Sequence, residues 1–382
     1  MSDIDLDQVR RQVAGRPGPP NAVDIADSLR ALGHVVTDTT VRSTLEALRR
    51  DSVGAGPLEA LLAMPGVTDV LVNGPNAVYL DRGNGLELTG VRFVDDAQVR
   101  RLAVRIAASA GRRLDDGVPC VDAQLADGTR VHALLGCLTD VGTVVSLRVP
   151  SARTWTLDDW VTAGSLTPGG AELLRRLVTR RAALLVSGGT GSGKTTLLGA
   201  LLGEVSPRQR IVVVEDAREL HPVHPHCLRL QARPPNGEGA GAVTMTDLVR
   251  QALRMRPDRL VVGEVRGAEV IDLLMAMNTG HEGGAGTVHA NSATDVLPRL
   301  EALAALGGLS RQALHAQVVA ALDVVIHVRR EPDGRRRLEQ IGVLTRDDAT
   351  GSAGIETAVS FLSSGAETPG PGWNAMARLV AP

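Results

Sequence analysis

Residues 183–202 read ALLVSGGTGSGKTTLLGALL, and this stretch decides the fold. The apolar run Leu184–Val186 is typical of a short strand buried on both faces. A glycine-rich turn follows, in which the missing Cβ atoms leave the backbone unusual freedom. From Thr195 the sequence favours a helix that Gly203 can end. The stretch therefore predicts a strand, a glycine loop and a helix in succession.

The loop matches the pattern G-x-x-x-x-G-K-[ST] through Gly188, Gly193, Lys194 and Thr195. Loop amides and the helix N-terminus present N–H donors and partial positive charge to an anion. We expect Lys194 to reach the β- and γ-phosphates of ATP, and Thr195 to ligate Mg²⁺. Lys194 is the only lysine among 41 basic residues, and a compact ammonium suits a phosphate cradle. The predicted nucleotide-binding residues are Gly188, Gly189, Thr190, Gly191, Ser192, Gly193, Lys194, Thr195 and Thr196.

Bulk composition limits the class of protein. A length of 382 residues exceeds one typical core and favours two domains. The net charge of −2 and an aromatic content of 2% disfavour direct nucleic-acid binding. Three widely spaced cysteines suit a reducing cytoplasm. Because no apolar run approaches about 18 residues and no signal peptide is evident, we expect no transmembrane segment.

The pattern along the chain predicts five regions. Residues 1–55 are expected to form a flexible arm with short helices, residues 56–150 a compact α+β domain, and residues 151–170 a linker. In residues 171–346 strands and helices alternate, which favours a largely parallel sheet covered by helices. Residues 347–382 are rich in Gly, Ser, Ala and Pro, and we expect them to be weakly ordered.

Carboxylates follow two strands of this predicted sheet. Glu215, Asp216 and Glu219 come after one strand, and Glu264 ends another. Ligands bind at the carboxyl ends of such strands, so these side chains could hold Mg²⁺ or activate the attacking water. Gly263 stands where a metal-facing Asp is usual, so the metal contact is expected at Asp216 or Glu215. The alternatives are a solvated acidic loop and an edge carboxylate satisfied by its neighbours.

Polar residues near the later strands extend the candidate site. Arg266 follows Glu264 closely and could pair with a phosphate or a carboxylate. His281 and His289 lie in GHEGGAGTVHANS (280–292), where His289 could sense the γ-phosphate or be structural. A zinc site on the loop around His221, His224, His226 and Cys227 is disfavoured, because the spacing fits no known pattern.

Taken together, these motifs resemble the type II/IV secretion ATPases, most closely the CpaF/TadA branch. The resemblance covers residues 56–344 and rests on SGGTGSGKTT, RIVVVEDAREL, RPPNGEGAGAVTMTDLVRQALRMRPDRLVVGEVRG and AMNTGHEGGAGTVHANS. It implies a RecA-like P-loop ATPase domain over residues 171–346. It also implies a Walker A loop, an Asp box and a Walker B glutamate. The residues so assigned, with the two His-box histidines, are Gly188–Thr195, Glu215, Asp216, Glu219, Glu264, His281 and His289.

The resemblance also implies partners and a mechanism. The family forms hexameric rings and pushes an inner-membrane platform protein from the cytoplasmic side. It brings N-terminal-domain arginines to the nucleotide, for which Arg112, Arg130 and Arg148 are the candidates here; each could equally be a surface arginine. This sequence departs from the family's His box at Gly284–Gly286. We expect an ATP-hydrolysing motor of a secretion or Flp/Tad-type pilus machine. The alternatives are a nucleic-acid translocase of a conjugation system and, less favoured, a small-molecule P-loop kinase.

Overall fold

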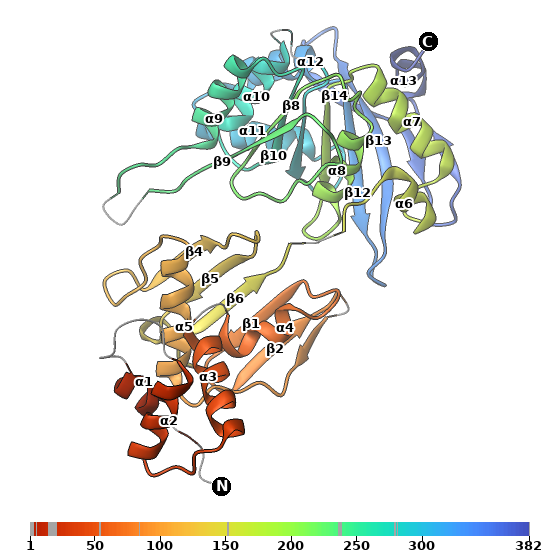
Figure 1. Cartoon of the computed structure of the whole chain (residues 1–382). Coiled ribbons are helices and arrows are strands. Elements are labelled where there is room, and N and C mark those ends of the chain that lie inside the picture. The colour runs from red at the N-terminus through yellow and green to blue at the C-terminus, as the bar shows by residue number, and fades with distance from the viewer. Residues whose placement is uncertain are drawn as a thin grey trace. The chain divides into compact units, whose positions relative to one another are not determined.

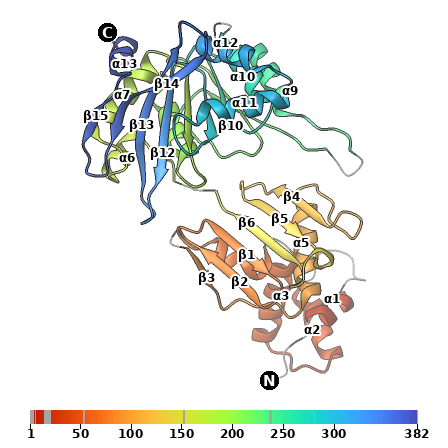
Figure 2. The same cartoon turned by 180° about the vertical axis from the view of Figure 1, so that it is seen from behind.

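The structure is a computed structural model that describes residues 4, 6–13, 21–52, 55–83, 85–150, 153–235, 239–278, 280 and 282–381. The chain divides into two compact units, Met1–Pro150 and Ser151–Pro382. Figure 1 and Figure 2 show them from opposite sides, and each unit is described by itself. Among the described residues, no helix combines the length and apolar content needed to cross a membrane.

Unit 1 begins with helices that pack together, where the sequence predicted a flexible arm. The helices are α1 (Leu6–Val13), α2 (Ala22–Ala31) and α3 (Asp38–Ser52). Asn21 caps α2 and forms a capping box with Asp24. Buried apolar side chains join the three helices, which corrects the prediction for the described part of residues 1–55. These side chains are Val9, Val13, Ile25, Leu29 and Leu48.

The rest of unit 1 is an antiparallel sheet of six strands with helix α5 (Asp96–Ser109) packed on it. The strand order is β3-β2-β1-β6-β5-β4. Short helical segments η1 (Gly56–Leu58), α4 (Glu59–Leu62) and η2 (Gly136–Leu138) complete it. The strands are β1 (Asp69–Asn73), β2 (Ala77–Asp81), β3 (Leu86–Leu88), β4 (Cys120–Gln124), β5 (Arg130–Leu134) and β6 (Val144–Arg148).

Unit 2 is built on a nine-stranded mixed sheet in the order β15-β14-β13-β12-β7-β11-β10-β8-β9. The strands from β12 to β9 in this order are mutually parallel, and β13, β14 and β15 extend the sheet antiparallel. The parallel strands are β7 (Leu184–Gly188), β8 (Ile211–Glu215), β9 (Cys227–Gln231), β10 (Arg259–Val265), β11 (Ala285–His289) and β12 (Val324–Arg330). The others are β13 (Arg336–Arg346), β14 (Ala353–Phe361) and β15 (Glu367–Pro369).

Helices cover both faces of this sheet. Leu184 and Val186 of β7 belong to one apolar core, with α6, α7, α8 and α13, and Leu185 belongs to the other, with α9 to α12. The alternation explains why β7 is apolar throughout, since both of its faces are buried. Figure 1 shows α6, α7 and α13 on one side of the sheet and α9 to α12 on the other. The helices are α6 (Leu157–Thr162), α7 (Pro168–Thr179), α8 (Lys194–Gly203), α9 (Met245–Ala252), α10 (Glu269–Asn278), α11 (Val296–Leu306), α12 (Arg311–Ala321) and α13 (Trp373–Leu379), with η3 (Leu253–Met255) after α9.

The predicted linker over residues 151–170 is wrong. Helix α6 lies inside it, begun by a capping box between Thr156 and Asp159, and α7 starts at Pro168. Leu157 and Trp160 are almost fully buried in the core beside α8. Polar capping residues and a proline suggested a connection, whereas they mark two helix starts.

The tail was also mispredicted. Residues after 347 form β14, β15 and α13, and Phe361 and Met376 are buried in the same core as β7. A Cβ at Gly370 or Gly372 would overlap the Thr357 or Glu356 backbone. The small residues that suggested weak order therefore allow close packing of the chain against β14.

Candidate functional site

The glycine loop adopts a conformation that depends on its glycines. Gly191 and Gly193 have φ angles of +69° and +97°, a region that side chains strongly disfavour. A Cβ at Gly188 would overlap the carbonyl oxygen of Val328 on the neighbouring strand β12. Gly193 is the N-cap of α8, so the helix N-terminus opens directly onto the loop.

Lys194 lies over this loop and is only 7% exposed. Its Nζ donates to the Gly189 carbonyl at 2.9 Å and lies 3.4 Å from Nδ1 of His289. Burial lowers the pKa of Lys194, whereas the charge of Glu264 opposes that shift. Burial, and next the charge of Lys194, lower the pKa of His289, so its imidazole is neutral at pH 7.

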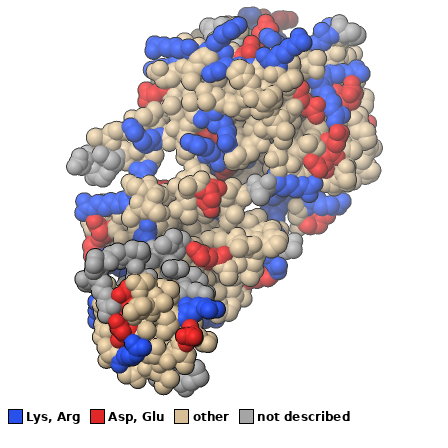
Figure 3. Space-filling view, viewed as in Figure 1, with Lys and Arg blue, Asp and Glu red and all other residues tan. Residues whose placement is uncertain are grey.

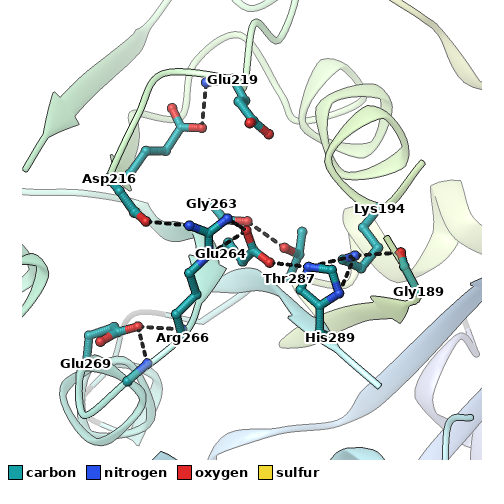
Figure 4. Close-up of polar contacts among 12 residues, drawn as sticks. Gly189, Lys194, Asp216, Glu219, Gly263, Glu264, Arg266, Glu269, Thr287 and His289 are labelled. Carbon is teal, nitrogen blue, oxygen red and sulfur yellow. Dashed lines mark hydrogen bonds and ion pairs between the residues drawn. The ribbon is translucent and has the colours of Figure 1, made fainter. Parts of the chain in front are cut away.

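A chain of polar contacts runs from Lys194 to the carboxylates (Figure 4). His289 Nε2 lies 2.6 Å from Oε1 of Glu264. Arg266 donates from Nε to Oε2 of Glu264 at 2.8 Å, with a second contact from Nη2. Arg266 Nη1 also donates to Oδ2 of Asp216 at 3.0 Å. Lys194 of the glycine loop, His289, Glu264, Arg266 and Asp216 thus form one connected cluster.

Sheet order brings these residues together. Glu264 is in β10, His289 ends β11, and Asp216 follows β8, and these strands are parallel neighbours whose carboxyl ends share one edge. The β10–β11 register shifts between Val262 and Val265. Thr287 Oγ1 donates to the Gly263 carbonyl within that irregular stretch, at 2.7 Å.

Glu215 occupies the space left by Gly263. A Cβ on Gly263 would lie 2.5 Å from Cγ of Glu215. Oε1 of Glu215 accepts hydrogen bonds from the amides of Glu219 and Leu220 at 3.0 and 2.9 Å. Oε2 is buried and has no hydrogen-bond partner among the residues that the structure describes. Burial is the main cause that raises the pKa of Glu215 from its ordinary 4.5 to about 7.

Of the other predicted residues, Glu219 belongs to unit 2 and the three arginines belong to unit 1. Glu219 contributes its backbone amide to Glu215, and its side chain is exposed. Arg130 and Arg148 lie in unit 1, directly opposite one another on β5 and β6, and Arg148 pairs with Asp69. Arg112 also belongs to unit 1. His281 lies outside the described residues.

The side chains near the glycine loop determine whether a metal ion can be bound there. In the described part of the chain, no group of three or more His, Cys, Asp or Glu side chains could hold a metal ion. Magnesium in nucleotide sites needs only one or two protein oxygens besides the phosphates, so Thr195 and Asp216 remain compatible with it. In the histidine-rich loop, His221 lies against Arg229, and His226 against Arg210.

Sequence reasoning missed two supporting residues of the site. Glu269 accepts the amides of Arg266 and Gly267 at 2.6 and 2.8 Å and so fixes the chain after β10. Thr287 was also missed. Neither stands in a motif with a chemical meaning. A carboxylate four residues after the end of a strand, at a helix start, was the available signal for Glu269.

Comparison with known proteins defines the class. Residues 51–353 match the family described as type II/IV secretion system protein. The chain therefore belongs to this family, and it is an ATPase with a two-domain, RecA-like fold. The predicted family and fold class are confirmed.

The chain is also similar to individual proteins and to solved structures. A putative conjugal transfer protein of Mycobacterium tuberculosis strain H37Rv is 56% identical over 80% of this chain and 89% of its own length. Conjugal transfer protein TrbB of Rhizobium radiobacter is 32% identical over 72% of this chain and 84% of its own. Among solved structures, the Legionella pneumophila ATPase DotB has a TM-score of 0.53 at 19% identity over 75% of this chain and 78% of that one. The pilus retraction motor PilT has 0.51 at 20% identity over 76% and 78%. These two similarities concern the fold alone.

Proposed function

We propose that this chain hydrolyses ATP between the glycine loop and the Glu264 cluster, and that the energy drives movement of a secretion or Flp/Tad-type pilus machine. The observation that carries the proposal is the chain of contacts from Lys194 through His289 to Glu264. It connects the group that neutralises phosphate charge to the carboxylate that activates water.

Each residue of the cluster has a role in this proposal. Lys194 binds the β- and γ-phosphates in place of its present contact with the Gly189 carbonyl. Glu264 accepts the proton of the attacking water. His289, neutral and beside both groups, orients Glu264 and contacts the γ-phosphate. Arg266 holds Glu264 and Asp216 in place between turnovers.

Magnesium, when bound, neutralises phosphate charge. Thr195 and Asp216 would hold it. Asp216 contacts Arg266 through Oδ2 at 3.0 Å, so metal binding at this carboxylate and the Arg266 contact are linked. Glu215 lies next to Gly263, and its buried Oε2, which has no partner in the described part of the chain, offers a further acceptor.

Unit 1 supplies the movement in this proposal. In this proposal Arg130 and Arg148, which lie directly opposite one another on β5 and β6, bind the γ-phosphate. Clamping and releasing the γ-phosphate would move the unit that ends at Pro150. We propose that six copies form a ring at the cytoplasmic face of the inner membrane and act on a platform protein there. The CpaF/TadA branch stays a prediction.

Measuring phosphate release tests whether the chain hydrolyses ATP as proposed. Lys194→Ala should abolish turnover and weaken ATP binding. Glu264→Gln should lower turnover by about 10²–10⁴-fold while ATP still binds, because only the proton acceptor is lost. A Glu264→Gln protein with full turnover would contradict the assignment. Measuring the mass of the native protein with and without a non-hydrolysable ATP analogue tests whether a ring forms. A protein that stays monomeric in both conditions would exclude the ring.

The names of the conjugal relatives give a reason to test DNA as a partner. Basic and acidic side chains are interspersed on the face in Figure 3, and the net charge is −2, so an electrostatic footprint for DNA is missing there. ATPase activity stimulated by DNA, with binding that falls steeply as salt rises, would favour the translocase.

A further inference from the structure

The hairpin of β12 and β13 carries five arginines in the sequence RREPDGRRR (329–337). Arg330 lies directly opposite Arg336, and Arg329 directly opposite Arg337. Because side chains of directly opposed residues share a face, the hairpin presents two arginine pairs on two faces.

The arginines differ in their partners. Arg329 pairs with Glu339 at 3.0 Å, Arg335 with Asp333 at 2.6 Å, and Arg337 with Glu331 and Glu339. In the part of the chain that the structure describes, no carboxylate oxygen lies within 4.0 Å of Arg330 or Arg336. Two like charges thus face each other without an acid, a destabilising arrangement on its own.

Both unpaired arginines lie against the glycine loop. Arg336 Nε donates to the Gly191 carbonyl at 3.1 Å, and its Cδ lies 3.2 Å from the position of a Cβ on Gly193. Arg330 Nη1 lies 3.5 Å from the corresponding position on Gly191. Partial desolvation, and next the charge of Arg330, lower the pKa of Arg336.

The hairpin is fixed relative to the loop. Strand β12 pairs with β7 from Leu184 to Ser187, and the buried Ser187 Oγ contacts Nδ1 of His327 at 2.9 Å. The strand that leads into the hairpin is therefore fixed beside the loop before any ligand arrives, which reduces the entropy cost of using the hairpin arginines for binding.

Strand order indicates which part of a nucleotide these groups would meet. Lys194, His289 and Glu264 lie toward β11 and β10, on one side of β7, and the hairpin is on the other side. The γ-phosphate belongs beside Glu264, where water is activated. The hairpin meets the loop at Gly191 and Gly193, away from Glu264, and loop amides cradle the α- and β-phosphates there.

We propose that Arg330 and Arg336 form a cationic subsite, supplied by the same chain, for the α-phosphate of the bound nucleotide. This rests on the proposed ATPase function. An α-phosphate is common to ATP and ADP, so the subsite binds substrate and product alike. Interactions equal in ground and transition states change KM more than kcat.

Calorimetry with Mg–ADP, which involves no hydrolysis, tests the subsite. Arg330→Gln and Arg336→Gln should each raise the Kd about tenfold, and the double variant should raise it more, because each loses a charge-assisted contact. Arg336→Lys, which keeps the charge, should recover part of the loss. Arg335→Gln removes an exposed, paired arginine of the same hairpin and should bind like the natural protein.

Thermal unfolding separates binding from folding. Without nucleotide, the double variant should be as stable as the natural protein or more so, since a like-charge contact is removed. With saturating Mg–ADP, its rise in Tm should be smaller. Unchanged Kd for ADP in the double variant, while the natural protein binds and hydrolyses ATP, overturns this inference alone. Absence of any Mg–nucleotide binding by the natural protein would overturn the proposed function.

Discussion

The two sides of strand β7 contrast in how their charges are balanced. Toward β10 and β11, Arg266 pairs with both Glu264 and Asp216, and His289 contacts both Glu264 and Lys194. Toward β12 and β13, Arg330 and Arg336 face the loop without a carboxylate among the described residues. One side is internally satisfied, and the other is complementary to an anion.

The contrast separates chemistry from binding. In the proposed function, the carboxylates that activate water and bind a metal change partners when nucleotide enters, so their side of the loop is the part that responds. Fixed cations need no rearrangement, so their side contributes affinity in every nucleotide state. Four substitutions test this difference between the two sides of β7.

The largest effect is expected at Gly188, where the two sides meet. Gly188→Ala would place a Cβ on the Val328 carbonyl oxygen, and relieving this overlap requires the backbone of β12 to move, which is unfavourable. We expect a loss of more than about 3 kcal/mol in the free energy of unfolding, and loss of Mg–ATP binding. Denaturant unfolding and calorimetry measure both. A variant as stable as the natural protein would show that β12 does not constrain the loop.

The second prediction concerns Glu215, whose pKa is raised from 4.5 to about 7. Between these values the folded state binds more protons than the unfolded state, so the free energy of unfolding falls as pH rises. The fall attributable to this group is about 3 kcal/mol from pH 4 to pH 8. Glu215→Gln removes it, so the variant should gain stability relative to the natural protein across that range. Parallel curves for both proteins would refute the assignment.

Arg266→Gln has a smaller expected effect. Without the guanidinium, Glu264 and Asp216 lose the cation that lies between them. Turnover at pH 7 should fall about tenfold as the carboxylate loses its orientation. Arg250→Gln breaks a pair with Asp272 elsewhere and should leave turnover unchanged. Faster turnover in Arg266→Gln would mean that the arginine inhibits instead.

The smallest effect on the free energy of unfolding is expected at Gly189, the residue that follows Gly188. A Cβ on Gly189 would meet nothing within 4 Å. Gly189→Ala should therefore change the free energy of unfolding by no more than about 0.5 kcal/mol. A large loss at this position would mean that glycine flexibility, and not the contact with β12, explains the Gly188 result.

The sequence predicted most of the site because its signals are local. Gly188–Thr195 fixes the loop by backbone conformation alone, and apolar runs identify β8, β10 and β11, whose ends carry Glu215, Asp216, Glu264 and His289. Parallel pairing then places those ends at one edge. The same reasoning failed for residues 151–170 and 347–382, because composition cannot distinguish a solvated loop from small and polar residues that cap helices or permit close packing.

The sequence by itself determined the phosphate loop, the strands around it and the membership of the secretion ATPase family, since each follows from residues close together in the chain. Only the tertiary structure decided which charges are neutralised. Arg336 contacts a carbonyl 145 positions away, and Glu215 fills the space beside Gly263, 48 positions on. Such contacts depend on the order in which strands join the sheet, and no local pattern encodes that order.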